Sequence, residues 1–486
     1  MSIPGLGQIP IQPVAPSTRT ILLRPTCEWH FKVSPGRSVV IKSQSGTCEM
    51  DGLELAPRTA YTLSGRQARI LTWHGCELEV DGRCDEDYVA EYDMTSRVNP
   101  ATAWLNLHAQ LAELRKAAAA SASTASATPG PRILVAGAPG RGKTSLVRTL
   151  ASYATRVGGQ PLVVNADPSQ AMLSLPGTLS AAVFATIMDI EAADHWGATP
   201  TSGPSSVPVK LPLVHYFGRR TAVQDAVFYK DLIGRLAGAV SSRLGDDAVV
   251  RSTGVLVDSM GVNPESSQEL DLLAHLVDEF STNIVVVVGS SSLATELAKR
   301  LAGERTSLAE PIQVVPVEGV VGEDTSDEGL QERAREQLIK EYFFGSARRS
   351  LSPQIQQVDF DSLVIYKLSD EAATGLAREE PSSSMEHWTL TVMHASTRDA
   401  PTTVRAATVM GFVYVADVDE ERRKARILAP VAGRLGDRPL LVGHAGCSEL
   451  AGACQSDMVA DWLPMSLMAR ALHHETVCAK ALILLS

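Results

Sequence analysis

Short runs in which apolar and polar residues alternate dominate the first part of the chain. Five such runs, TRTILLRP, WHFKVSPG, RSVVIKSQSG, TAYTLSG and ARILTWHG, each end at Gly, Pro or Ser. They recur at a spacing of about ten residues, and no helical periodicity accompanies them. The pattern therefore predicts an all-β sandwich or barrel over residues 19–95.

A helix is predicted directly after these strands, in NPATAWLNLHAQLAELRKAAAA, with Asn99 as its cap and Pro100 at its first position. We group the strands and the helix as an N-terminal domain over residues 19–120. Residues 1–18 are rich in Pro and Ser and are predicted to be a flexible arm. The segment SASTASATPGP at 121–131 is predicted to be a flexible linker.

From residue 132 the pattern changes to continuous apolar strands that alternate with helices. RILVAG, QPLVVNAD, TGVLVDS and NIVVVVGS are strands of this kind, and helical segments such as KTSLVRTLASYATRV and ELDLLAHLVDEF lie between them. Strands buried on both faces indicate a parallel sheet covered by helices, so the predicted fold class is α/β. The segment DEGLQERAREQLIKEYFFG is predicted to close this central domain, 132–346, as an amphipathic helix with Leu330, Ala334, Leu338 and Tyr342 on its apolar face.

The pattern returns to strands after about residue 350, in DSLVIYKL, HWTLTVMHAS, TVMGFVYVADVD and KARILAPV. These predict a small third domain over residues 347–445, which the family resemblance described below implies to be an α/β domain. The remaining segment, 446–486, is mildly apolar with a helical pattern, and its structure is left open.

Composition and charge narrow the classes of function. The chain has 486 residues and a formal net charge of −11, which argues against a strongly basic nucleic-acid surface. Its seven cysteines form no CxxC pair, so we expect the reduced thiols of a nuclear or cytosolic protein. We expect no secretory signal and no transmembrane helix, because no apolar stretch reaches about 18 residues.

One motif carries specific chemistry. The segment GAPGRGKTS at 137–145 fits G-x-x-x-x-G-K-[ST] and lies between a buried strand and a helix. In such a P-loop, backbone N–H groups surround the phosphates, the lysine bridges the β- and γ-phosphates, and the Thr hydroxyl binds Mg²⁺. The motif predicts a bound nucleoside triphosphate with Mg²⁺, which the resemblance given below narrows to ATP. The predicted nucleotide-binding residues are Gly137, Pro139, Gly140, Arg141, Gly142, Lys143, Thr144 and Ser145.

A P-loop site also needs a carboxylate that organises the metal bound by Thr144. Asp167, at the end of QPLVVNAD, is the favoured candidate because it follows the strand directly after the P-loop helix. The alternative role for Asp167 is to cap the turn before Pro168. Asp258, at the end of TGVLVDS, is the rival candidate for the metal.

The chain resembles the polynucleotide 5′-hydroxyl-kinase family, which includes the ATP-binding subunit of the pre-mRNA cleavage and polyadenylation machinery. The similar blocks are LTWHGCELEVDG, GAPGRGKTS, DPSQAMLSLPGT, PLVHYFG and IKEYFFG. The resemblance implies a central P-loop NTPase domain between an N-terminal β-sandwich and a C-terminal domain. It also implies nuclear RNA 3′-end processing or tRNA splicing, with the subunits of cleavage factor IA as partners, especially its polymerase-tail-binding scaffold subunit.

The resemblance further implies an adenine pocket in the N-terminal domain. Glu28 aligns with a family glutamate that approaches the adenine edge, and Met50 aligns with the residue that stacks on the base. The alternative is that both are ordinary residues of the sandwich.

Active members of this family phosphorylate 5′-hydroxyl RNA ends, whereas others, notably fungal ones, bind ATP and act as scaffolds. The Thr-x-Asn clasp of active members aligns here with Val223–Gln224 and Asp225. A tryptophan that stacks on the RNA base aligns with Val262, so a stacking energy of about 1–3 kcal/mol is missing. The negative charge of Asp225 is expected to repel a phosphodiester.

The predicted lid helix departs from the family in part. Arg335 matches one lid arginine, but the position of the second falls at Gln331 or Glu332. The alternative is a solvated helix face in which Arg333 and Arg335 pair with neighbouring glutamates.

Together these departures favour an ATP-binding scaffold of the fungal, non-catalytic type. The alternative is an active polyribonucleotide 5′-hydroxyl kinase, in which Asp167 is metal organiser or base and Arg335 is the lid cation. A P-loop switch ATPase is less favoured, because no residue that orients an attacking water can be named.

Overall fold

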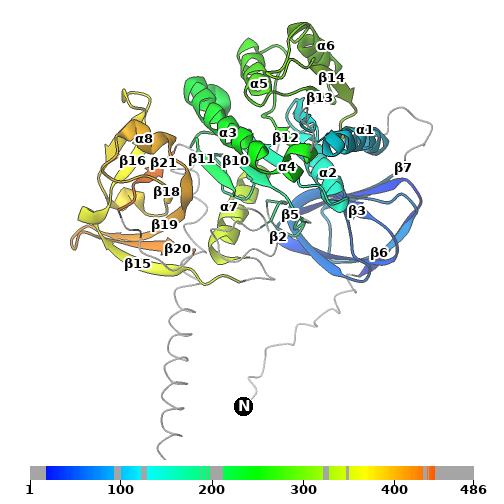
Figure 1. Cartoon of the computed structure of the whole chain (residues 1–486). Helices are drawn as coiled ribbons and strands as arrows, with labels where there is room; N and C mark the ends of the chain where they lie inside the picture. The colour runs from blue at the N-terminus through cyan, green and yellow to red at the C-terminus, as the bar shows by residue number, and fades with distance from the viewer. Residues whose placement is uncertain are drawn as a thin grey trace, which may run out of the picture. The chain divides into compact units, whose positions relative to one another are not determined.

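The computed structural model describes residues 18–91, 100–121, 128–197 except 187 and 193, 212–320, 328–345, 350–430, 435 and 437–443. They fall into two compact units, which are described separately. The first unit comprises the chain up to residue 96 except 51–53, and the second comprises 51–53 and the chain from residue 97. Three seven-stranded sheets, one in the first unit and two in the second, provide the framework (Figure 1).

The first unit is the predicted all-β domain. Its sheet has the order β1-β6-β2-β5-β3-β4, with β7 paired to β2, and its pairs are antiparallel. Trp29 and Phe31 of β2 are buried in its core and stack with ring centroids 4.4 Å apart. The strands are β1 (Arg19–Leu23), β2 (Cys27–Gly46), β3 (Glu49–Met50), β4 (Leu53–Glu54), β5 (Ala60–Leu71), β6 (Cys76–Asp81) and β7 (Glu86–Glu91).

Two of the predicted strand ends in this unit are wrong. WHFKVSPG and RSVVIKSQSG form the single strand β2, and TAYTLSG and ARILTWHG form the single strand β5. Gly36 and Gly65, at which the sequence pattern predicts turns, have φ values of +82° and +60°. The register of β2 on β5 shifts between Val33 and Ser38, so the glycines bend continuous strands instead of ending them.

The second unit begins with the predicted P-loop sheet, whose order is β11-β10-β9-β12-β8-β13-β14. β9, β12, β8, β13 and β14 run parallel to one another, as predicted. β10 pairs antiparallel with β9 on one side and with β11 on the other, so the sheet is mixed. The strands are β8 (Arg132–Gly137), β9 (Leu162–Asn165), β10 (Thr178–Val183), β11 (Leu213–Tyr216), β12 (Val255–Asp258), β13 (Ile284–Val288) and β14 (Gln313–Val317).

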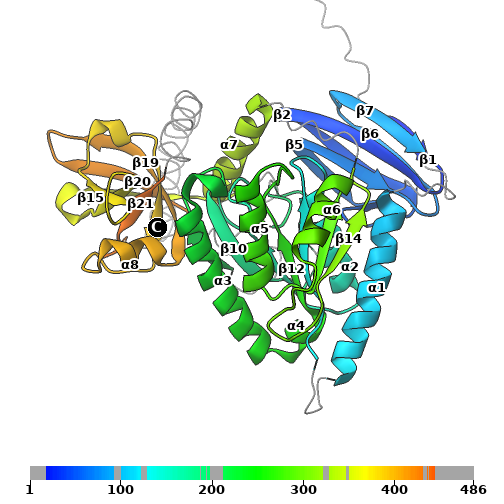
Figure 2. The same ribbon diagram turned by 90° about the horizontal axis from the view of Figure 1, so that it is seen from above.

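Helices cover both faces of this sheet. Leu232, Leu273 and Leu297 of α3, α5 and α6 lie in the core on one face. Trp104 and Leu146 lie in the core on the other face. They belong to α1 and α2, which Figure 2 shows beside each other. The helices are α1 (Pro100–Ser121), α2 (Lys143–Arg156), α3 (Ala226–Asp246), α4 (Ala248–Thr253), α5 (Ser267–Glu279), α6 (Ser291–Arg300) and α7 (Glu328–Phe344).

Two helices differ in detail from their predictions. The structure groups α1 with the second unit and not with the β-sandwich, and Arg115 of α1 donates from Nε to the carbonyl of Thr253 over 2.9 Å. In the described part of α7 the buried residues are Ile339, Tyr342 and Phe343, so the apolar face is rotated from the predicted one.

A second sheet in this unit forms the C-terminal domain, with the order β15-β20-β19-β18-β21-β16-β17. Only β16 and β21 pair in parallel among its described strands. The predicted tail 446–486 lies outside the described residues, and no described helix is long and apolar enough to cross a membrane. The elements are β15 (Gln354–Asp359), β16 (Ile365–Leu368), β17 (Leu376–Glu379), β18 (Thr389–Met393), α8 (Pro401–Ala406), β19 (Val409–Asp419), β20 (Lys424–Ala429) and β21 (Leu440–Val442).

Candidate functional site

The loop 137–145 connects the end of β8 to the start of α2. Gly137, Gly140 and Gly142 have φ values of +159°, +70° and +86°, and Gly142 is the left-handed N-cap of α2. A Cβ atom at Gly137 would lie 2.8 Å from the carbonyl oxygen of Val288. The glycines are therefore required for the backbone to wrap around the N-terminus of α2, where N–H groups and the helix dipole favour an anion.

Lys143 is held over this loop. Its side chain is buried, and Nζ donates to the carbonyl oxygen of Ala138 over 3.0 Å. The ammonium group thus lies across the concave side of the loop, where it can contact phosphate oxygens.

Thr144 is paired with the rival carboxylate, Asp258. Thr144 Oγ1 donates to Asp258 Oδ2 over 2.7 Å, and Asp258 ends β12, the strand beside β8. The other carboxylate oxygen, Oδ1, is buried and has no hydrogen-bond partner among the described residues. Burial, aided by the charge of Asp167, raises the pKa of Asp258 to about 6, although Thr144 and Lys143 act in the opposite direction.

Asp167, the favoured carboxylate, makes hydrogen bonds that cap the turn around Pro168, which is the alternative role predicted for it. Its Oδ1 accepts hydrogen bonds from the backbone N and the Oγ of Ser169, over 2.9 and 2.7 Å. Burial raises the pKa of Asp167, while Ser169, Lys143 and Arg335 lower it. Asp167 and Asp258 interact electrostatically with each other and with Lys143, so capping the turn does not remove Asp167 from the site.

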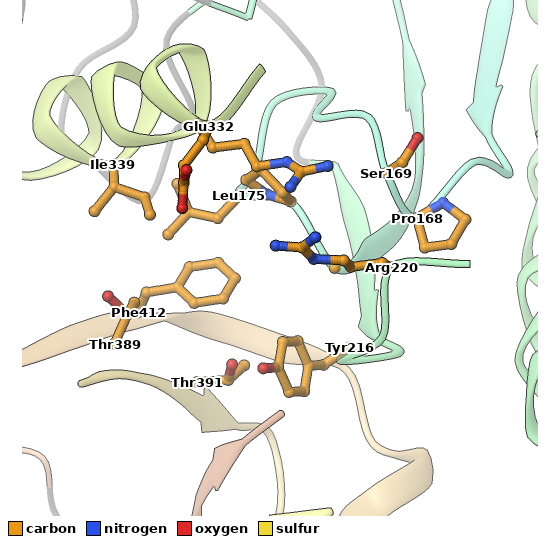
Figure 3. A pocket seen from close by; sticks show the side chains of 13 residues that line it. Pro168, Ser169, Leu175, Tyr216, Arg220, Glu332, Ile339, Thr389, Thr391 and Phe412 are labelled. Atoms are coloured by element: carbon orange, nitrogen blue, oxygen red, sulfur yellow. The ribbon is translucent and has the colours of Figure 1, made fainter. Parts of the chain in front are cut away.

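A pocket opens beside Asp167, between the central and C-terminal domains (Figure 3). Its volume is about 50 Å³. In Figure 3, Glu332 and Ile339 extend from α7 on one side, and Thr389 and Phe412 of the C-terminal domain lie on the other. The lining residues are Pro168, Ser169, Leu175, Pro176, Gly177, Tyr216, Arg220, Glu332, Arg335, Ile339, Thr389, Thr391 and Phe412.

Arg335, the predicted lid arginine, lines this pocket and is half-buried. Burial and the neighbouring charge of Arg220 lower the pKa of Arg335, whereas Glu332 and Asp167 raise it. Arg335 therefore lines the pocket and interacts electrostatically with Asp167, and it is not merely part of a solvated face. Arg333 is exposed, and the side chain of Gln331 lies outside the described residues.

Arg220 was missed by the sequence analysis. It follows the PLVHYFG block in the pair Arg219–Arg220, and this pair of cations directly after a strand was the available signal.

Two residues that align with the RNA clasp, Gln224 and Asp225, make hydrogen bonds within the fold. Gln224 Oε1 accepts hydrogen bonds from the backbone N atoms of Arg220 and Thr221, over 3.0 and 3.1 Å. Asp225 caps α3 and accepts a hydrogen bond from Nη2 of Arg405 over 2.5 Å. Arg405 offsets the charge of Asp225, and the expected repulsion of a phosphodiester by Asp225 stays a prediction.

Val262 occupies a core position. Its side chain is fully buried, and its backbone N donates to the carbonyl oxygen of Gly137 over 3.1 Å. Besides lacking a flat ring, as the sequence predicts, this position offers no exposed surface on which a base could stack.

Models of known protein families match three segments of the chain. Residues 22–118 match the "N-terminal beta-sandwich domain of polyadenylation factor", 137–345 match the "mRNA cleavage and polyadenylation factor CLP1 P-loop", and 351–449 match the "Pre-mRNA cleavage complex II protein Clp1". The chain belongs to the Clp1 family.

Full-length fungal relatives of this Clp1-family chain are known. It is 48% identical over 450 residues to the mRNA cleavage and polyadenylation factor CLP1 of Pyricularia oryzae, covering 91% of this chain and 98% of the relative. The corresponding protein of Botryotinia fuckeliana is 43% identical over 464 residues, with the same coverage.

Among solved structures, a Clp1p–Pcf11p complex matches with a TM-score of 0.78 and 27% identity, covering 88% of this chain and 98% of that one. A second structure with the same scores concerns an extended Pcf11p–Clp1p interface and ATP loss in a point mutant of that protein. The loop 137–145 of this Clp1-family chain lies within the segment that matches the P-loop model.

Glu28, the adenine-edge candidate, is fully buried inside the first unit of this Clp1-family chain. Its carboxylate pairs with His30 Nε2 at 2.9 Å and with Arg69 Nη1 at 3.0 Å. Burial raises the pKa of Glu28, but Arg69 and His30 outweigh it, so the pKa lies below its usual value. Met50 is also buried. These contacts favour the structural alternative, and the adenine role of Glu28 stays a prediction.

Proposed function

We propose that the chain is the ATP-binding scaffold subunit of the mRNA 3′-end cleavage and polyadenylation machinery. It holds ATP–Mg²⁺ as a structural ligand and docks partner subunits in the nucleus. One observation supports the scaffold over the kinase: a complete phosphate-binding loop stands beside a buried Val262 and a bonded Asp225, at the two positions where an RNA clasp would be needed.

The residues that would hold the nucleotide are those of the loop 137–145. The backbone N–H groups and Lys143 would bind the phosphates. Mg²⁺ fits the oxygen donors that lie together here, because Thr144 Oγ1 can be a ligand and the unpaired Oδ1 of Asp258 can hold the metal's water shell. Asp167 would support that shell from the neighbouring strand end. When bound, Mg²⁺ neutralises phosphate charge.

The proposed partner is a protein subunit of cleavage factor IA of the Pcf11 type. A Clp1p that matches 88% of this chain is solved in complex with Pcf11p, and this supports a protein interface on the same fold. Contact with RNA would then be indirect, through the other subunits of the complex.

The test is direct. The purified full chain is extracted for nucleotide, and is then incubated with γ-labelled ATP and 5′-hydroxyl RNA oligomers. We expect intact ATP in the extract and no transfer of label to RNA. Transfer at ordinary kinase rates, about 1–100 s⁻¹, would overturn the scaffold role.

The second candidate, a polyribonucleotide 5′-hydroxyl kinase, is favoured by Arg335. This arginine reaches from the lid helix towards Asp167 and lines a pocket that also contains Arg220. In that case Asp167 would organise the metal or accept the hydroxyl proton, and Arg335 would stabilise the transferred phosphoryl group. Loss of label transfer in Arg335→Gln, with ATP still bound, is the result that would support it.

A further inference from the structure

Charged side chains of the central domain form ion pairs with charged side chains of the C-terminal domain. Arg219 of the central domain pairs with Asp370 of the C-terminal domain. In return, Arg405 of α8 pairs with Asp225, at the N-terminus of α3. We call these four residues, Arg219, Asp225, Asp370 and Arg405, the latch.

Arg405 is enclosed on three sides. Its Nη2 lies 2.5 Å from Asp225 Oδ2, and its guanidinium carbon lies 3.7 Å from the ring centroid of Phe228. The backbone of Gly375 closes over the same guanidinium group, so that a Cβ atom there would collide with Arg405. A cation held against an aromatic face and a carboxylate gains from both.

The two bridges differ in their exposure to solvent. The Asp225 and Arg405 side chains are 21% and 16% exposed, so water screens this bridge poorly. Arg219 is 6% exposed, but its partner Asp370 is 70% exposed. Substitution of Asp225 or Asp370 leaves a buried arginine without its main partner, which lowers the stability of the fold. Asp370 can be changed with little effect on packing.

The latch adjoins the pocket on both of its walls. Arg219 directly precedes Arg220, which lines the pocket from the central domain. On the other wall, α8 leads into β19, which carries Phe412, and β18 beside it carries Thr391. Thr391 is 1% exposed, and its Oγ1 has no hydrogen-bond partner among the described residues.

The pocket is therefore polar at Thr391, charged at Arg220, Arg335 and Glu332, and small. Its volume is about 50 Å³. Because Thr391 is almost fully buried, a ligand can reach its hydroxyl group only if one wall moves.

We propose that the latch holds the two walls of this pocket together, and that its release moves the C-terminal wall away from Tyr216 and Arg220. The groups at its mouth are two guanidinium groups and one carboxylate, so the opened pocket suits an anionic group. This inference concerns domain closure, and it does not require that the chain bind ATP or act as a scaffold.

The experiment measures access to the pocket wall in the full chain. Thr391→Cys places a thiol of similar size at the wall, and its rate of alkylation by N-ethylmaleimide is followed by peptide mass spectrometry. Asp225→Asn removes the charge that faces Arg405 but keeps the cap of α3, because Asn caps as well as Asp does. Asp370→Asn breaks the exposed bridge. The matched control is Asp231→Asn, whose partner Arg235 lies 2.9 Å away on the same helix.

We expect alkylation at position 391 to accelerate about tenfold in Asp225→Asn, because a partly buried ion pair is lost. A smaller acceleration is expected in Asp370→Asn, and none in Asp231→Asn. Equal rates in all variants would overturn the proposal.

Hydrogen exchange separates opening from general loss of stability. In the chain with its natural Thr391, exchange should accelerate in β18, α8 and residues 365–379, but not in β8 and β12. Parallel acceleration of β8 and β12 would show that the four residues only stabilise the whole unit, and would also overturn the proposal.

Discussion

Thr144 and Asp258 join the first turn of the P-loop helix to the end of the neighbouring strand through a hydrogen bond of 2.7 Å. The bond leaves one oxygen of Asp258 without a partner among the described residues, in a site that already contains Lys143 and Asp167. This pair is where the proposed metal dependence of nucleotide binding can be tested.

Asp258→Asn should weaken nucleotide binding only when Mg²⁺ is present. Asn can still accept the Thr144 hydrogen bond, but it lacks the charge that supports the metal's water shell. We expect the Mg²⁺-dependent gain in ATP affinity to fall by about ten- to a hundredfold, measured by calorimetry with and without Mg²⁺. Asp167→Asn is the companion variant. An equal loss with and without Mg²⁺ would mean that Asp258 acts on the loop and not on the metal.

Lys143→Ala should lose bound nucleotide and, with it, affinity for the partner. The buried ammonium group is held at the loop by Ala138, so its removal should lower ATP affinity by about ten- to a hundredfold. Nucleotide content and binding to a Pcf11-type fragment are measured on the same preparation. Lys299→Ala, on an exposed helix face, is the control. Unchanged partner affinity without nucleotide would exclude ATP as a structural ligand of that interface.

Val262→Trp should destabilise the central domain without creating an RNA site. The valine is fully buried, so a larger ring must displace its neighbours, at a cost of about 3 kcal/mol in the free energy of unfolding. Val227→Trp, at a position that is 83% exposed, is the matched control and should be nearly neutral. Thermal unfolding and RNA binding are measured for both. A stable Val262→Trp variant that gains RNA affinity would contradict the core assignment.

Glu28→Gln should destabilise the first unit in a pH-dependent manner. Since Arg69 and His30 lower the pKa of Glu28 below its unfolded value, the ionised carboxylate adds stability above about pH 4.5, and this is lost as the pH falls through the lower folded-state pKa. At neutral pH we expect the free energy of unfolding of the variant to be lower by about 1–3 kcal/mol.

Hydrogen exchange in β2 and β5, compared at several pH values, measures this loss. The difference between the two proteins should narrow towards acid. A difference that does not change with pH would assign the effect to packing. If Glu28→Gln does not change the stability, Glu28 is not needed for the fold and is available for another role.

The phosphate site could be predicted from the sequence because its chemistry is local. Nine consecutive residues define the loop, and the flanking apolar strand and helix fix its context. Which carboxylate, Asp167 or Asp258, lies beside Thr144 could not be predicted in this way, because it depends on the order of the strands in the sheet. β12 lies between β8 and β9 in the sheet although it follows both in the chain, and hydrophobic patterns do not reveal such an insertion.

The role of Asp225 was also beyond the sequence. Its partner Arg405 is 180 residues away, on a helix of six residues that no periodicity distinguishes. In the β-sandwich, Gly36 and Gly65 carry the same local signal whether a strand turns or only bends. Long-range pairing decides between these outcomes, and a single sequence does not contain it in readable form.

The position of α1 determines where the chain can be divided. Trp104, Leu107 and Leu111 of this helix are buried in the core on one face of the P-loop sheet, and Trp104 Nε1 donates to the carbonyl oxygen of Glu318 over 3.1 Å. A truncated protein that starts at residue 128 would expose that face to water. A protein that starts before Pro100 would keep this helix over the sheet, so the second unit is best separated from the first by cutting within 92–99.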